Sequence, residues 1–150
     1  MQHPHRFITL SVTVVSAVLI AIIPAWAADD TEPLELRSIM QELGEEMQTI
    51  TDGISREDWA LVAETAPMIA NHSQPSAIER MRILGFLGTD ASTFRNHDKK
   101  IQQAALQLEK AAENQNGAEV IAAFATLQNR CLACHQDFRN PFMEHFYDDP

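Results

Sequence analysis

From residue 28 onward, apolar residues recur at every third or fourth position, which is the period of a helix with one buried face. No stretch shows the strict apolar and polar alternation, bounded by turn residues, that indicates a strand. In the first segment the apolar residues follow spacings of four and three: Leu36, Met40, Leu43, Met47 and Ile50. This spacing predicts a helix that packs along its length against other helices.

Capping residues and helix breakers divide the first half of this region. Thr31 can cap the first helix, and Ser55 can cap the second. Pro67 lies inside the second helix and predicts a kink there. A short apolar segment over residues 78–87 is expected to be helical and to stop at Gly88.

Two further helices are expected in the second half. The third runs from about Asp90 to Asn114, and the Asn116-Gly117 turn makes it an antiparallel neighbour of the fourth. The apolar stripe of the fourth helix consists of Val120, Phe124, Leu127, Cys131, Cys134 and Phe138. Residues after Pro141 are expected to form a tail that frays from Glu144 to Pro150. The pattern predicts an all-α protein, one antiparallel up-down-up-down four-helix bundle.

The N-terminal residues follow a different pattern. An apolar run from Phe7 to Ile23 follows Arg6 and precedes Ala25-Trp26-Ala27, as in a secretory signal peptide with its A-x-A cleavage site. We expect residues 1–27 to be the signal peptide and residues 28–150 to be the exported domain, located in the periplasm. An uncleaved anchor is the alternative, although the run is marginal for the ~20 residues that span a bilayer. No second apolar segment predicts a stable membrane span after cleavage.

The composition narrows the classes of partner. The chain of 150 residues has 11 Lys and Arg against 21 Asp and Glu, a formal net charge of -10. Such a surface repels phosphates, so nucleic acid is excluded as a partner. The same net charge predicts that redox partner proteins present basic patches.

The chemistry is concentrated in the sequence Cys131-Leu132-Ala133-Cys134-His135, a C-x-x-C-H motif of the kind that attaches c-type haem. On a helix, Cys131 and Cys134 lie one turn apart, so that each thiol can add to one haem vinyl group. His135 then presents its imidazole to the iron as the proximal ligand. We therefore expect one covalently bound haem c per chain.

The cysteine pair has three alternative interpretations. A thioredoxin-like redox pair requires a βαβ pattern, which the sequence lacks. A zinc site requires four ligands, and the chain has no second cysteine pair. A structural disulfide is the third, and the adjoining His135 favours haem over all of them.

The sixth coordination position of the iron decides the mechanism. In the predicted topology the beginning of the first helix faces the end of the fourth, which places Met40 at the depth of His135. Met47 lies about 10 Å deeper and is read as core packing. A Met40 thioether would complete a His/Met iron with a raised potential, whereas a Met40 that only packs would leave the iron five-coordinate. His97, on the inward stripe of the third helix, is read as a hydrogen-bonded histidine and not as a ligand.

The run Cys-Leu-Ala-Cys-His-Gln-Asp-Phe-Arg near the end of a four-helix bundle resembles the class II c-type cytochromes, the cytochrome c′ superfamily and its low-spin relatives. The resemblance covers essentially the whole exported chain. It implies that Met40 occupies the axial position of the Met-ligated branch. It also implies that Arg139 lies near the proximal histidine or a haem propionate, although Arg139 can equally be a favourable cation in the last helical turn. The family usually has an arginine four residues before the distal position, whereas Arg37 lies three before Met40.

These observations predict a protein that is not an enzyme and carries single electrons. The alternative is a five-coordinate, cytochrome c′-like protein that binds nitric oxide or carbon monoxide at an open distal face. A monomer and a homodimer both remain open.

Overall fold

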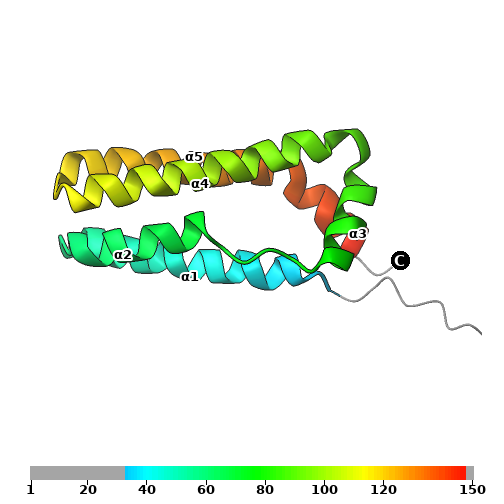
Figure 1. Ribbon diagram of the computed structural model, residues 1–150, viewed down its shortest axis with the longest axis horizontal. Coiled ribbons are helices and arrows are strands. Elements are labelled where there is room, and N and C mark those ends of the chain that lie inside the picture. The colour runs from blue at the N-terminus through cyan, green and yellow to red at the C-terminus, as the bar shows by residue number, and fades with distance from the viewer. Residues whose placement is uncertain (1–32, 148–150) are drawn as a thin grey trace, which may run out of the picture.

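The computed structural model describes residues 33–147, which form a bundle of long helices (Figure 1). In chain order, its elements are α1 (Glu35–Ser55), α2 (Trp59–Ala70), α3 (Ala77–Leu87), η1 (Gly88–Asp90), α4 (Ala91–Glu113) and α5 (Gly117–Phe146). The proposed signal peptide and Thr31 lie outside the described residues. Within residues 33–147, no helix combines the length and apolarity that crossing a bilayer requires.

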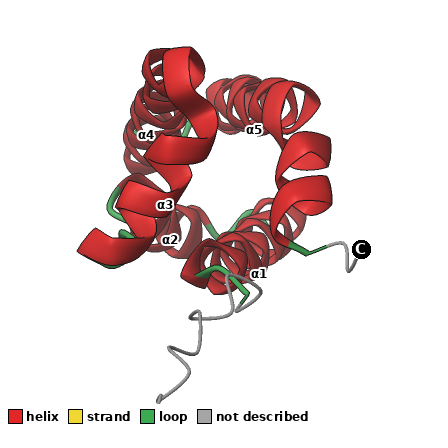
Figure 2. Ribbon diagram, turned by 90° about the vertical axis from the view of Figure 1, so that its right-hand side faces the viewer, coloured by secondary structure: helices red, strands yellow, loops and turns green. Residues whose placement is uncertain are grey.

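The four long helices confirm the predicted up-down-up-down bundle. α1 packs on α2, α2 on α4, and α4 on α5, whereas α1 approaches α5 at few points. Seen along its axis, the bundle is a ring of four helices, with α3 at one end (Figure 2). The chain therefore has a closed end, formed by the turns after α1 and α4, and a more open end where α3 and the last turns of α5 lie.

Side-chain caps define the helix starts, and one of them corrects the sequence prediction. Asp58, and not Ser55, caps α2 by accepting the backbone N–H of Leu61 at 3.1 Å. Ser55 is instead the last residue of α1, and its hydroxyl donates to the carbonyl of Thr51. The glycine stop was predicted correctly, since Gly88 ends α3 with a φ of +51°, which glycine adopts without strain.

α1 begins without a cap from its own sequence. The buried Glu79 carboxylate of α3 accepts the backbone N–H groups of Glu35 and Leu36, where the helix dipole favours negative charge. In return, Glu35 accepts the N–H of Ser76, the cap residue of α3, at 2.7 Å. These reciprocal carboxylate caps fix α3 against the first turn of α1.

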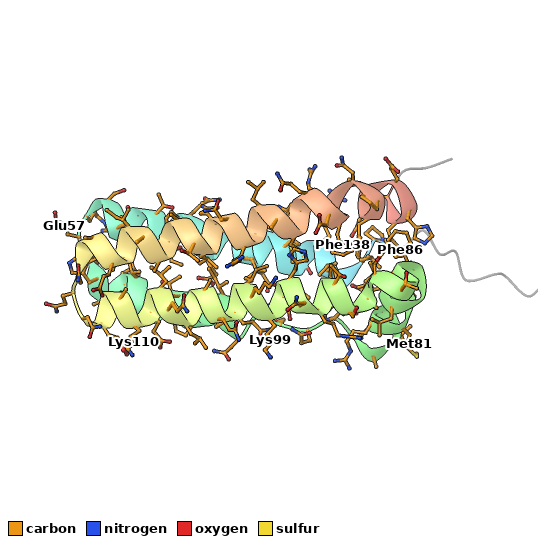
Figure 3. The ribbon with its side chains drawn as sticks, turned by 90° about the horizontal axis from the view of Figure 1, so that it is seen from above. Glu57, Met81, Phe86, Lys99, Lys110 and Phe138 are labelled. Carbon is orange, nitrogen blue, oxygen red and sulfur yellow. The ribbon has the colours of Figure 1, made fainter. Side chains whose placement is uncertain are left out.

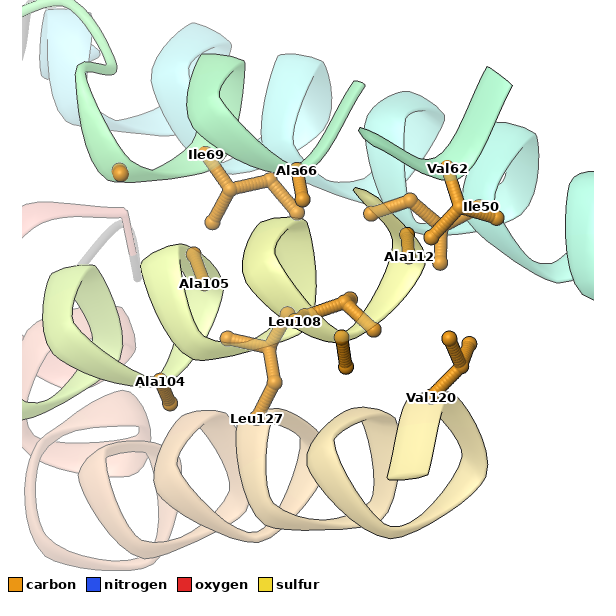
Figure 4. Close-up of a cluster of buried hydrophobic side chains, with 12 residues drawn as sticks. Ile50, Val62, Ala66, Ile69, Ala104, Ala105, Leu108, Ala112, Val120 and Leu127 are labelled. Carbon is orange, nitrogen blue, oxygen red and sulfur yellow. The ribbon is translucent and has the colours of Figure 1, made fainter. Parts of the chain in front are cut away.

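The core consists of two clusters. The first fills the bundle from its closed end to its middle with aliphatic side chains (Figure 4): Ile50, Val62, Ala66, Ile69, Ala70, Ala104, Ala105, Leu108, Ala111, Ala112, Val120 and Leu127. The second lies at the open end and contains Leu34, Ile83, Leu87, Phe138, Phe142 and Phe146. The haem motif lies where the two meet, because Cys131 packs against the first cluster and Cys134 against the second.

The second cluster explains why the predicted tail was wrong. α5 continues through Pro141 to Phe146, although the proline ring removes one backbone hydrogen bond. Phe142 and Phe146 are each 7% exposed, and both pack against Phe86 of α3. Burial of two aromatic side chains outweighs the cost of the proline, so the last turns stay helical.

Candidate haem-binding site

Cys131 and Cys134 lie one turn apart on α5 and are half-buried. Both are free thiols, so the structure has no disulfide between them. Burial raises the pKa of the Cys131 thiol. Burial, followed by the charges of Cys131, Asp98 and Asp137, raises the pKa of Cys134 to about 11.

These pKa shifts distinguish among the chemistries of a cysteine pair. A reactive redox pair stabilises its thiolate and lowers its pKa, and here both shifts have the opposite sign. Moreover, no three His, Cys, Asp or Glu side chains among residues 33–147 are grouped so that they could hold a metal ion. The pair is suited to remain as protonated thiols until it is modified covalently.

His135 follows directly on α5 with an exposed side chain. Partial desolvation lowers its pKa first, and the positive charge of Arg139, one turn further along the helix, lowers it second. Both effects favour the neutral imidazole, which is the form that binds a metal ion. The charge of Arg139 therefore acts on His135, and a contact of Arg139 with a haem propionate stays a prediction.

Across from this motif, a surface groove separates α1 from α5. It has a volume of about 370 Å³ and is lined by Met47, Gln48, Thr51, Asp52, Ser55 and Gln128. Met40 lies seven residues before Met47, and His135 lies seven residues after Gln128. Because α1 and α5 are antiparallel, seven residues are two turns on each helix and move both positions about 10 Å in the same direction. Met40 and His135 thus both lie beyond the groove, toward the open end of the bundle.

Comparisons with known proteins agree with this site. The profile of a family described as Cytochrome C′ matches residues 87–139, which include α4 and the motif as far as Arg139. A cytochrome c′ of Rhodospirillum rubrum is 31% identical over 137 residues, covering 82% of this chain and 92% of the relative. The chain belongs to the cytochrome c′ family. No solved structure matches it significantly.

Membership confirms the predicted cofactor class. Proteins of the cytochrome c′ family carry covalently attached haem c and act in electron transfer or gas binding, and their relatives are periplasmic. In this cytochrome c′ relative, two free thiols one turn apart and an imidazole with a lowered pKa lie in the middle of α5. Facing flanks also expose apolar side chains, since Met40 is 41% and Leu132 53% exposed. A flat, largely apolar porphyrin fits these residues, because it would cover such surfaces while the thiols hold its edge.

The other histidines among residues 33–147 have partners outside the motif. His97 on α4 hydrogen-bonds Asp137 on α5 at 2.8 Å, as expected for a boundary histidine. His72, in the connection after α2, hydrogen-bonds Asp98 at 2.9 Å. That carboxylate raises the pKa of His72 above its ordinary value of 6.5. His145 stacks on Phe86 at 4.3 Å between ring centroids, in the helical segment that was expected to be a tail.

Sequence reasoning missed several residues that shape the site. Asp98 and Asp137 act on Cys134 from two helices, and nothing in their spacing singles them out among 21 acidic residues. Phe86 and Phe142, with ring centroids 5.3 Å apart, belong to the aromatic packing of the second cluster, against which Cys134 also packs. Figure 3 shows Phe86 and Phe138 at the open end of the bundle. The spacing of Phe138, Phe142 and Phe146 at every fourth position was a usable signal that α5 extends beyond Pro141.

Proposed function

We propose that this cytochrome is an exported mono-haem electron carrier, with its haem held by thioethers to Cys131 and Cys134. His135 is the proximal ligand of the iron, and Met40 is the distal ligand. The observation that supports the proposal is that Met40 and His135 lie on the antiparallel helices α1 and α5, both between the groove and the open end of the bundle. Cleavage after Ala27 would release the protein into the periplasm.

The residues of the chain set the conditions for carrying an electron. When bound, the haem supplies one iron that accepts and releases a single electron. His135 binds in its neutral form, which its lowered pKa favours. Met40 would hold the iron through its thioether, and a ligand kept in both oxidation states favours electron transfer.

Arg139 supports the site from the proximal side. α5 extends seven residues beyond Arg139, so this arginine is not in the last helical turn, where His145 lies instead. The alternative of a helix-dipole cation is therefore weakened. Arg139 lies one turn beyond His135 on α5, where its guanidinium is suited to pair with a haem propionate. Arg37 is engaged differently, because its guanidinium lies 5.5 Å from the centre of the Tyr147 ring.

Membership of the cytochrome c′ family supports a second candidate function, the binding of a small gas. The relative in Rhodospirillum rubrum is a cytochrome c′, a family that includes gas-binding proteins. If Met40 remains on the surface, where it is 41% exposed, the distal side of the iron stays open to nitric oxide or carbon monoxide. The two functions differ in the role of one side chain.

Optical spectra of the haem-loaded protein and of Met40→Ala distinguish the two. We expect a low-spin wild type with a methionine–iron band that does not bind carbon monoxide when reduced. Met40→Ala should lose that band and bind the gas. Met47→Ala is the matched control, two turns along the same flank, and should keep the wild-type spectrum. A high-spin wild type that binds carbon monoxide unaided would refute Met40 ligation and establish the gas-binding function.

A further inference from the structure

The short helix α3 is apolar on two opposite sides. Its inner side packs Ile83 and Leu87 into the second core cluster. At 100° per residue, its outer side consists of five residues, all exposed: Ala77, Ile78, Met81, Leu84 and Gly85. Ile78 and Met81 are 70% and 66% exposed, the highest values among the large apolar residues that the structure describes. A helix needs only one apolar side to pack on its own core, so the second is unexplained by the fold.

This outer face lies close to the haem motif. Figure 3 shows Met81 at the outer edge of the open end, with Phe86 further inside. Beneath α3, the second cluster includes Cys134 among its partly buried members. The cluster on which α3 packs therefore extends to a proposed point of haem attachment. The reciprocal caps between α3 and α1 hold α3 in place on this cluster.

The charges along the edges of the face are positive. Arg80 is exposed on one edge, and Arg82 lies on the other with its guanidinium 5.8 Å from the centre of the Phe146 ring. The single acidic residue of α3, Glu79, is 5% exposed and points to the start of α1. The face is thus an apolar centre with cationic edges, and α3 itself adds no exposed anion.

The size of the face argues against a stable dimer. The exposed fractions of Ile78, Met81 and Leu84 add up to less than two fully exposed side chains. A stable interface buries about 800 Å² on each partner, whereas encounters between redox proteins are at the low end of interface sizes. A bilayer of anionic lipids would repel the rest of the chain, which has a net charge of -10. The net charge therefore argues against a membrane as the partner of this face.

We propose that the outer face of α3 is the docking surface for a redox partner protein with an apolar spot bordered by carboxylates. The proposal rests on the electron-carrier function and adds the place and chemistry of the encounter. It differs from the basic patches predicted from the net charge, because that charge is a sum over the chain and the α3 edges are cationic. Burial of the apolar centre holds the complex, and the exposed Arg80 orients it.

The test measures electron transfer from the reduced haem-loaded protein to two oxidants. One is an acidic blue-copper protein whose copper edge is apolar and ringed by carboxylates, and the other is ferricyanide, which needs no docking surface. Ile78→Ser should lower the second-order rate constant with the copper protein about fivefold. Ile121→Ser, on α5 and 59% exposed in the wild type, is the matched control and should leave it unchanged. Arg80→Glu should lower it about tenfold at low salt, and the deficit should shrink as salt screens the charges.

Ile78→Ser and Ile121→Ser should react with ferricyanide at the wild-type rate, and Arg80→Glu should do so at high salt, where the charge of this anionic oxidant is screened. A wild-type rate for Ile78→Ser with the copper protein, or equal losses in Ile78→Ser and Ile121→Ser, would overturn the docking surface. Two other results would also overturn the proposal. One is that the wild type binds phosphatidylglycerol vesicles and Ile78→Ser does not. The other is that the wild type is a dimer in sedimentation equilibrium and Ile78→Ser is not. A wild type that fails to reduce either oxidant would contradict the electron-carrier function itself, which separates the two failures.

Discussion

Replacement of Glu79 by glutamine tests whether a carboxylate joins α3 to α1. The side chain is 5% exposed, and its two oxygens accept the backbone N–H groups of Glu35 and Leu36. Glutamine has nearly the same shape but offers one carbonyl oxygen and one NH₂ group. In Glu79→Gln the NH₂ group would face a backbone donor, so one hydrogen bond is lost together with the negative charge.

The expected loss of stability follows from these two contributions. A hydrogen bond to a charged acceptor contributes about 1.5–3 kcal/mol. A negative charge at the start of a helix contributes a further ~0.3–1 kcal/mol. Because glutamine keeps one bond, we expect the free energy of unfolding to fall by about 2–3 kcal/mol. For a domain of this size, the melting temperature should fall by about 10 °C.

Thermal and urea unfolding of the haem-loaded protein, followed by far-ultraviolet circular dichroism, measures this loss. Glu144→Gln is the control, since Glu144 is exposed on α5, and it should change stability by less than about 0.5 kcal/mol. If Glu79→Gln is as stable as that control, the carboxylate does not hold α3 in place and the reasoning is refuted.

Two further predictions concern the ion pair of His72 and the packing of glycines. Asp98 raises the pKa of His72 above 6.5, so the pair stabilises the fold fully below pH 6.5 and loses this effect as the pH rises through the raised value. His72→Gln should be about 1–2 kcal/mol less stable than wild type near pH 5.5, and urea titrations across pH that show a constant difference would contradict the ion pair. A Cβ at Gly53 would lie 2.9 Å from Cγ2 of Val62, so Gly53→Ala should lose about 1 kcal/mol despite better helix propensity. At Gly85, a Cβ meets nothing within 4 Å, so Gly85→Ala should gain up to about 1 kcal/mol, and the reverse order of the two melting temperatures would refute the packing argument.

The sequence predicted the helices well, but it misplaced the start of α2 and the end of α5. The features predicted correctly depend on residues that are close in sequence. The helical period and the Asn116-Gly117 break act over a few residues, so α4 and α5 begin where the pattern indicates. Ser55 and Asp58 are both residue types that cap helices well, and in the structure Asp58 is the cap of α2. The end of α5 depends on Phe86, which comes from a helix more than fifty residues earlier.

The candidate site divides in the same way. Cys131, Cys134 and His135 lie within five consecutive residues, so a helical spacing alone brings them together. The acidic partners of the two buried histidines come from other segments, and no local pattern indicates them. The topology fixes the direction of α1 relative to α5, so Met40 and His135 are expected toward the same end of the bundle. Ligation of the iron by Met40 stays a prediction.

α3 shows what periodicity can and cannot convey. A sequence with apolar residues on both sides of a helix predicts that one side is buried, but it does not say which. The structure resolves this through Glu79, because the carboxylate must reach the N–H groups of α1 and therefore turns Ile83 and Leu87 inward. Ile78 and Met81 are then left outside by the geometry of the same helix. The surface proposed for docking is thus a direct consequence of the contact that fixes α3, and a variant that weakens this contact should also slow transfer to the copper protein.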